Sequence, residues 1–202
     1  MLYYHGWDDK KKDHKNAFEI FKNCVENDKA FENADTVYCM VMIGYMYLKG
    51  EGVEMDSKIA KGYFEKSSSI GNSSAMNYLG LLYKDGIGVE KDLNKAKLYF
   101  EESSKRKNSG AMFNLGMLYL MGDGVEKDLE KSKRYFIDSS EMNNPSSLYS
   151  LGLMHLEGNG FEKNENKAIE YFIKSSDLGD LHSTYTLGMI YMEGKKTNIK
   201  SF

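Results

Sequence analysis

Pairs of glycines separated by one residue are the first candidates for chemistry in this sequence. A glycine-rich turn can cradle a phosphate when it follows a β-strand and opens a helix. Gly86 and Gly88 have this spacing, but no strand pattern precedes them, and the spacing recurs at Gly50/Gly52, Gly122/Gly124 and Gly158/Gly160. The recurrence predicts a structural turn at each pair, and no nucleotide cofactor.

The histidines are candidates for general bases or zinc ligands. They are His5, His14, His155 and His182, and no two have a spacing such as H-x-x-x-H that would place zinc ligands on one helix face. His155 falls where equivalent segments of the chain have tyrosine, so we interpret it as a packing residue with a polar tip. His182 is expected to be exposed near a helix start. We therefore predict no metal site.

Serine pairs offer hydroxyl groups that could act as nucleophiles. They recur at Ser67-Ser68, Ser103-Ser104, Ser139-Ser140 and Ser175-Ser176, without a base at a matching distance. We interpret them as small residues at contacts between helices. The sequence thus predicts no catalytic residue, and we expect the chain not to be an enzyme.

A repeat accounts for this recurrence of motifs. Four segments align without gaps, beginning at Ile43, Leu79, Leu115 and Leu151, and a fifth begins at Leu187. Their second residues are glycines spaced 36 residues apart, at Gly44, Gly80, Gly116, Gly152 and Gly188. A fixed period of this length is typical of solenoids, in which each repeat buries its apolar face against its neighbours.

Each repeat is predicted to form a first helix, here called helix A, then a loop and a second helix, helix B. In the second repeat, Leu79, Leu82 and Tyr83 have helical spacing and predict helix A over about 73–84. The glycine pair ends this helix, because glycine tolerates the left-handed conformation. Asp92 is a good N-cap for helix B, and its position is held elsewhere by Asp56, Asp128 and Asn164.

The glycine in the middle of helix A needs a reason, since it costs about 1 kcal/mol relative to alanine. A small residue of helix B follows it by 16 positions in every full repeat: Ala60, Ala96, Ser132 or Ala168. We expect the glycine to allow close approach of helix B, which carries this small residue.

The predicted fold class is all-α, a right-handed α/α solenoid of helix-loop-helix repeats. The expected units are 1–36, a partial repeat with helix B and a loop inserted near 27–35; full repeats at 37–72, 73–108, 109–144 and 145–180; and a partial repeat at 181–202. Because the sequence begins and ends inside a repeat, we expect a fragment of a longer solenoid or unusual end caps.

Composition limits the classes of partner and compartment. The formal net charge is −3, hydrophobic residues make up 41%, and charges of both signs are interspersed, so no basic surface for nucleic acid is expected. No apolar run has the length of a membrane span or the pattern of a signal peptide, which favours the cytoplasm. Cys24 and Cys39 fall on neighbouring predicted helices, where they form either two buried reduced thiols or a single bridge.

The pattern A-x-x-x-L-G-x-x-Y-x-x-G-x-G-V-x-x-D-x-x-K-A-x-x-Y-F, complete at Ala75 to Phe100, resembles the Sel-1-like repeat. This repeat is a relative of the tetratricopeptide repeat, whose unit is about 34 residues. The resemblance covers roughly residues 13–194. Departures include Ser-Ser for the usual Ala-Ala in helix B, and His155 and Phe161 in the fourth repeat. The resemblance implies an adaptor or scaffold that binds other proteins.

In tetratricopeptide relatives helix A lines the concave face, and transferring that geometry selects three positions in each repeat. This concave stripe lies two residues before, two after and five after the repeat Leu or Ile. It comprises Val41, Tyr45, Leu48, Asn77, Leu81, Lys84, Phe113, Met117, Leu120, Tyr149, Leu153, Leu156, Tyr185, Met189 and Met192. Most are aromatic, Leu or Met. The stripe is either an open groove for a partner or core buried between successive helices A.

Three functions follow from these alternatives. The first is an adaptor that holds a peptide or helix of a partner protein in the groove, with apolar anchors and polar residues such as Asn77 and Lys84 at the rim. In that case Phe113→Ala or Tyr149→Ala should weaken capture and leave the fold intact. The second is a structural spacer of a larger protein, with end-to-end self-association. A hydrolase is the third and least supported.

Overall fold

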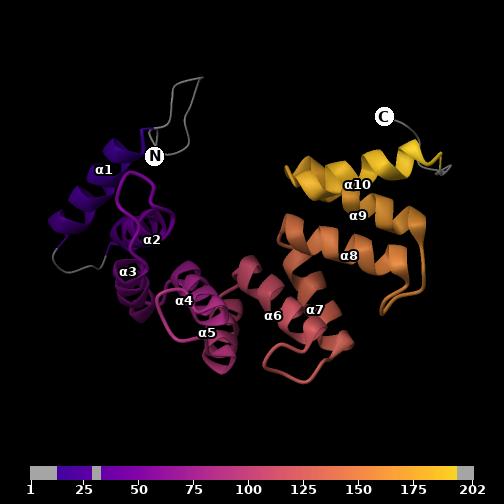
Figure 1. Ribbon diagram of the computed structural model, residues 1–202, viewed down its shortest axis with the longest axis horizontal. Helices are drawn as coiled ribbons and strands as arrows, with labels where there is room; N and C mark the ends of the chain where they lie inside the picture. Colours follow the sequence, from indigo (N-terminus) through magenta and orange to yellow (C-terminus); the bar gives the residue numbers. More distant parts are fainter. Residues whose placement is uncertain (1–12, 29–32, 195–202) are drawn as a thin grey trace. The chain divides into compact units, whose positions relative to one another are not determined.

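In the computed structural model, residues 13–28 and 33–194 are described, and they form ten α-helices without a β-strand (Figure 1). The helices are α1 (His14–Asn27), α2 (Ala34–Lys49), α3 (Ser57–Ser69), α4 (Ser73–Asp85), α5 (Leu93–Lys105), α6 (Ser109–Met121), α7 (Leu129–Ser140), α8 (Pro145–Glu157), α9 (Glu165–Asp177) and α10 (Leu181–Met192). The predicted all-α class is confirmed. From α2 onward, even-numbered helices are helices A and odd-numbered helices are helices B.

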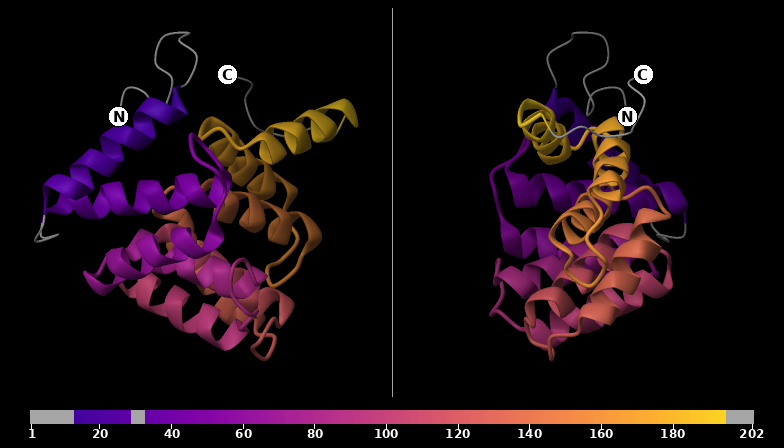
Figure 2. Two further views of the ribbon diagram at one scale, coloured as in Figure 1. Left: turned by 60° about the vertical axis from the view of Figure 1, so that its left-hand side comes forward. Right: turned by 90° about the vertical axis from the view of Figure 1, so that its right-hand side faces the viewer.

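The chain divides into two compact units, residues 1–106 with α1 to α5 and residues 107–202 with α6 to α10. Within each unit every helix packs against the next one along the chain. Figures 1 and 2 show this succession of helix pairs, each joined by an extended loop between helix A and helix B. The sequence period therefore corresponds to one pair of helices.

The ends of the helices are fixed by the residues that the sequence singled out. Gly86 has a φ of 72°, and its backbone N–H donates to the carbonyl of Leu82, which ends α4. Asp92 then begins α5, since its Oδ1 accepts from the backbone N–H of Lys95 at 2.9 Å. The amide Oδ1 of Asn164 accepts from Lys167 N–H at the same distance. The predicted N-caps are confirmed.

The reason expected for the glycine in helix A is confirmed in its main part, because helix B does approach it closely. A Cβ atom on Gly44 would lie 2.7 Å from Cε1 of Phe64 in α3, so the nearest side chain is a phenylalanine ring, one helical turn after the small residue Ala60. Phe64, Phe100, Phe136 and Phe172 are all fully buried. Glycine is needed because the ring fills the space that a side chain on helix A would take.

Some predictions fall partly or wholly outside the described residues. The expected insertion near 27–35 lies between the end of α1 at Asn27 and the start of α2 at Ala34, and 29–32 are not among the described residues. His5 also lies outside them. Across residues 13–28 and 33–194, no helix combines the length and apolar character that crossing a membrane requires.

Candidate functional site

The concave stripe is neither uniformly open nor uniformly buried. Val41 is only 5% exposed and packs in the core with Ala60 and Phe64, so its place among partner-binding residues was wrong. Residues of α3 cover the Val41 side chain, so a partner protein has no access to it. Tyr185, Met189 and Met192 on α10 are exposed, and Met192 is 82% exposed. The remaining stripe residues are half-buried.

In the first unit the stripe is covered in part by its own neighbours. The ring centroids of Tyr45 and Tyr78 are 6.0 Å apart, and Leu48 packs on the buried cluster around Phe64. Lys84 Nζ lies 3.5 Å from Asp85 Oδ1. Asn77 and Leu81 are half-buried. Half-burial here reflects packing between adjacent helices.

In the second unit five of the stripe residues line one cleft. Phe113, Met117 and Leu120 from α6 and Tyr149 and Leu153 from α8 line a hollow of about 360 Å³. Its volume falls within the range of about 300–1,000 Å³ that is typical of ligand pockets. Leu156 packs beside it on the cluster around Phe172. Five of the predicted residues thus form a shared apolar surface that a single α-helix could not provide.

Small residues on α8 keep this cleft open. Ser150 lines it and occupies the position that Tyr78 holds two repeats earlier. In the first unit Tyr78 stacks on Phe64, with ring centroids 4.8 Å apart. Phe136 is the equivalent of Phe64 and is instead approached by Phe113 at 5.8 Å. The serine leaves the space that a tyrosine ring would fill.

Polar residues also contribute to the lining of the cleft. Ser146, Glu157, Asn159, Asp180 and His182 also line it. Asp180 accepts the backbone N–H of Ser183 at 2.7 Å and caps α10, so its position is fixed. His182 is exposed, as predicted, and its ring centroid lies 5.9 Å from that of Tyr149. The site therefore combines apolar side chains with groups that can form hydrogen bonds.

The sequence analysis missed the serines and the other polar residues of the lining. It selected three fixed positions in each helix A, and Ser146 and Ser150 lie at other positions. A usable signal was present, because Ser150 differs from Tyr78 and Asn114 at the equivalent positions. A position that holds a large residue in one repeat and a small residue in another marks a place where packing is incomplete.

The serine pairs have structural partners. Ser103 Oγ donates to the carbonyl of Ser73 at 2.7 Å, and Ser175 Oγ donates to Pro145 at the same distance. Each bond joins the end of a helix B to the first turn of the preceding helix A. Ser104 Oγ instead donates to Glu101 in its own helix. These contacts support the interpretation of the pairs as residues at contacts between helices.

His155 is buried, as a packing residue should be. Its ring stacks between Phe161, with centroids 4.2 Å apart, and Tyr171, with centroids 5.6 Å apart. Desolvation by burial lowers the pKa of His155 from its ordinary value of 6.5, and the charges of Lys167 and Lys133 lower it further. The imidazole is therefore neutral at neutral pH and behaves as an aromatic ring.

The cysteines are free. Cys39 is buried on α2, and Cys24 of α1 packs on the same cluster. Burial is the main cause that raises the pKa of Cys39 to about 12, and the neighbouring Cys24 contributes. Of the two alternatives, the structure contains separate thiols.

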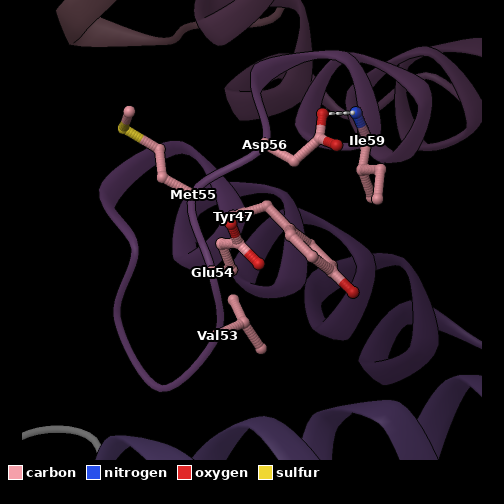
Figure 3. A pocket seen from close by; sticks show the side chains of 6 residues that line it. All are labelled: Tyr47, Val53, Glu54, Met55, Asp56 and Ile59. Carbon is pink, nitrogen blue, oxygen red and sulfur yellow. Dashed lines mark hydrogen bonds between the residues drawn. The ribbon is translucent and has the colours of Figure 1, made fainter.

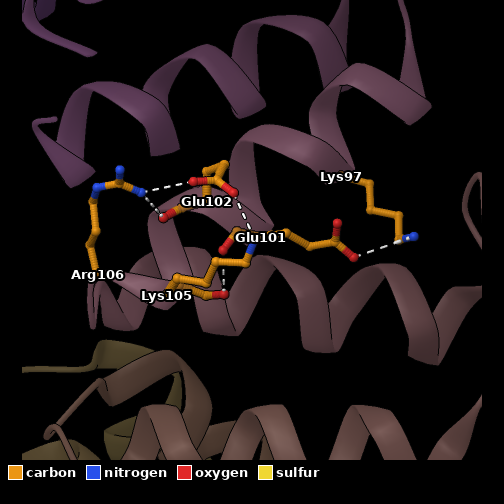
Figure 4. Close-up of polar contacts among 6 residues, drawn as sticks. Lys97, Glu101, Glu102, Lys105 and Arg106 are labelled. Atoms are coloured by element: carbon orange, nitrogen blue, oxygen red, sulfur yellow. Dashed lines mark hydrogen bonds and ion pairs between the residues drawn. The ribbon is translucent and has the colours of Figure 1, made fainter. Parts of the chain in front are cut away.

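Charged groups on the surface form local pairs and no cluster with metal-binding geometry. On α5, Glu102 pairs with Lys105 at 2.7 Å and with Arg106 at 2.9 Å, and Lys97 pairs with Glu101 at 3.3 Å (Figure 4). Such exposed pairs contribute little to stability. In the part of the chain that the structure describes, no three His, Cys, Asp or Glu residues are placed to hold a metal ion.

The family model described as Sel1 repeat matches residues 1–22, 37–72, 73–108, 109–144 and 145–180. A comparison with curated proteins gives no match. Among solved structures, a Sel1 repeat protein from Oxalobacter formigenes is similar, with 29% identity and a TM-score of 0.74. The match covers 89% of this chain and 76% of that one.

Two further structures have the same fold. One is c5321, a protective antigen of uropathogenic Escherichia coli with an SLR fold, at 26% identity and a TM-score of 0.71. That match covers 96% of this chain but 40% of c5321. The other is the immunity protein Pa5087 from Pseudomonas aeruginosa, at 22% identity and a TM-score of 0.70, covering 95% of this chain and 68% of that one. At this identity the likeness concerns the fold alone.

Proposed function

Because the chain belongs to the Sel1 repeat family, whose members are generally protein-interaction scaffolds, we propose that it is a non-catalytic adaptor that binds a segment of a partner protein. The segment is a peptide or helix, and its apolar anchor enters the cleft between α6 and α8. Two free thiols, Cys24 and Cys39, support a reducing compartment such as the cytoplasm as the place of action.

The cleft in the second unit carries this proposal. Its lining contains the apolar and aromatic side chains of Phe113, Met117, Leu120, Tyr149 and Leu153 together with several polar groups. Interfaces obtain most of their binding energy from a few such anchors in desolvated pockets, and polar rims fix register. Methionine adds adaptability, since its flexible thioether can repack around different side chains.

The size of the cleft favours a single large side chain with its flanking backbone. A hollow of about 360 Å³ accommodates an aromatic or leucine side chain more readily than a whole helix. Ser146 and Ser150 add hydroxyl groups to the lining, and Asp180 adds a carboxylate. The proposal therefore specifies an apolar or aromatic anchor flanked by hydrogen-bond donors.

Peptide selection on the purified chain tests this function. We expect a displayed random library to yield peptides with a shared aromatic or leucine anchor. In spectra of the chain with labelled methionine methyl groups, such a peptide should shift the resonances of Met117 and Met154, which line the cleft. Met142, which is 41% exposed and does not line the cleft, serves as the control. Selected peptides that shift Met142 and leave Met117 unchanged would refute the cleft as the binding site.

A further inference from the structure

Every full repeat stacks one aromatic ring of helix A on a tyrosine of helix B. The pairs are Tyr47 with Tyr63, Tyr83 with Tyr99, Tyr119 with Tyr135 and His155 with Tyr171, with interplanar angles of 9° to 14°. One face of each helix A ring is therefore covered in the same way. The four repeats differ in which further group, besides the tyrosine of helix B, contacts the helix A ring.

In the second and third repeats the additional group is a lysine from the start of helix B. Lys95 Nζ lies 5.2 Å from the ring centroid of Tyr83, and Lys131 Nζ lies 5.2 Å from that of Tyr119. Each ammonium also pairs with the N-cap carboxylate, Lys95 with Asp92 at 3.4 Å and Lys131 with Asp128 at 3.0 Å. The fourth repeat has Phe161 stacked on its ring instead. A cation held between a ring and an N-cap carboxylate is thus a recurring arrangement of this chain.

The first repeat keeps the ring and the carboxylate but has no such lysine. Ile59 stands at the position of Lys95, and Met55 stands at the position of Lys91. Asp56 Oδ1 accepts from the backbone N–H groups of Lys58 and Ile59, both at 2.9 Å. Within residues 13–28 and 33–194, no lysine, arginine or histidine pairs with Asp56 or lies over the Tyr47 ring. Phe18 contacts Tyr47 edge-on, with centroids 5.5 Å apart.

A hollow of about 500 Å³ lies at this place. Tyr47, Val53, Glu54, Met55, Asp56 and Ile59 line it, and Figure 3 shows Asp56 bonded to the backbone of Ile59 above the Tyr47 ring. Among the described residues of the lining, both charged groups, Glu54 and Asp56, are acidic. Met55 is 69% exposed and Ile59 is 42% exposed, so apolar surface flanks the carboxylates. The lining combines an aromatic face, negative charge and apolar flanks.

We propose that this hollow binds a lysine side chain of a partner protein, with its ammonium over Tyr47 and paired with Asp56. The partner's lysine takes the place that Lys95 and Lys131 occupy within their own repeats. Its methylene groups pack on Met55 and Ile59, because long basic side chains bury their stems on apolar surface while the charge stays paired. This site lies in the first unit and is separate from the cleft between α6 and α8.

The charge of the hollow decides which occupant fits. An acidic segment would meet Glu54 and Asp56 and be repelled, and a purely apolar one would leave the Asp56 carboxylate without a cation. A lysine can pair with the carboxylate and lie over the ring at the same time. Lys95 and Lys131 do so in the second and third repeats, with the same types of ring and carboxylate.

Two short peptides that differ at a single side chain test the proposal. The probes are acetyl-Ser-Ala-Lys-Ala-Ser-amide and its norleucine counterpart, titrated at millimolar concentration into the full chain with labelled tyrosine rings and backbone amides. We expect the lysine peptide to give saturable shifts at the Tyr47 ring and the Ile59 amide. The norleucine peptide should give none there. Equal shifts from both peptides, or no shift from the lysine peptide, would overturn the proposal.

Two variants separate binding at this hollow from unspecific effects. Asp56→Asn retains an N-cap, as Asn164 does for α9, and should weaken the lysine peptide about two- to fivefold, the range of an exposed ion pair. Ile59→Lys supplies the internal lysine found at Lys95 and should abolish the peptide's shifts while the chain stays folded. Unchanged binding by Ile59→Lys would show that the lysine enters elsewhere and contradict the site.

Discussion

A Cβ atom on Gly116 would lie 2.6 Å from Cδ1 of Phe136, which is closer than packed carbon atoms can approach. Gly116 lies in the middle of α6, and Phe136 lies on the facing side of α7. The same relationship joins Gly44 to Phe64 in the first unit. The glycine and the phenylalanine are therefore a single packing element, repeated along the chain, in which the missing side chain leaves room for the ring.

Replacing this glycine should destabilise the fold. Gly116→Ala places a methyl group against Phe136, and overpacking of this kind costs about 1–3 kcal/mol. The matched control is Gly188→Ala in α10, where no described atom lies within 4 Å of the added group. That change should stabilise its helix by up to about 1 kcal/mol. Denaturant unfolding measures both, and equal effects of the two changes would contradict the packing argument.

The buried serines at the ends of helices B should contribute through their hydrogen bonds. Ser103 is fully buried and donates to Ser73, so Ser103→Ala should lower the free energy of unfolding by about 0.5–1.5 kcal/mol. Ser69→Ala removes an exposed hydroxyl in the same unit and should have little effect. If Ser103→Ala were as harmless as Ser69→Ala, the serine would serve only as a small residue.

His155 should make the stability of the second unit depend on pH. Its pKa is lowered in the folded chain, so the unfolded chain takes up the proton first as the pH falls through about 6.5. The contribution of His155 is thus fully present above that pH and is lost below it. His155→Tyr, which restores the residue found at Tyr119, should remove this component.

The comparison of the two proteins between about pH 7 and pH 5 isolates the histidine. Carboxylates that also titrate are common to both, so the difference between the two unfolding curves reports His155. We expect the loss of stability on acidification to be larger in the wild type. Parallel losses in both proteins would contradict the assignment.

Alkylation should distinguish the two thiols. Cys39 is buried and its pKa is raised to about 12, so almost none of it is thiolate at neutral pH. Cys24 is only partly buried. With iodoacetamide, peptide mapping by mass spectrometry should find Cys24 modified well before Cys39. Faster modification of Cys39 would show that α1 and α2 separate readily.

Local features of the fold could be predicted from the sequence because they depend on residues close together in the chain. The N-cap role of Asp92 needs only the next turn of helix, and the helix-ending role of Gly86 needs only its own φ angle. The side chain nearest to the helix A glycine was missed, because the spacing between Gly44 and Ala60 does not show which buried residue of α3 lies closest to it. Choosing Phe64 over Ala60 requires the crossing of the two helices.

The candidate site was predicted in part for the same reason. Phe113, Met117 and Tyr149 were selected by position within a repeat, and they do line the cleft. Val41 was selected by the same rule and is buried in a cluster with Ala60 and Phe64. Ser150 was missed because it lies outside the three selected positions, although it differs from Tyr78 and Asn114 at the equivalent positions of other repeats. Differences between repeats were therefore more informative about the site than the repeated pattern.

The binding cleft is tested most directly by filling it with a side chain that the fold already accepts. Ser150→Tyr introduces the residue that Tyr78 provides at the equivalent position of the second repeat, and Ser74→Tyr places the same side chain on an exposed site of α4. The measurement is the dissociation constant of a selected peptide for both variants. We predict at least a tenfold loss of affinity, about 1.4 kcal/mol, for Ser150→Tyr, with Ser74→Tyr equal to the wild type. Equal affinity of a folded Ser150→Tyr variant would contradict the claim that the cleft binds the partner.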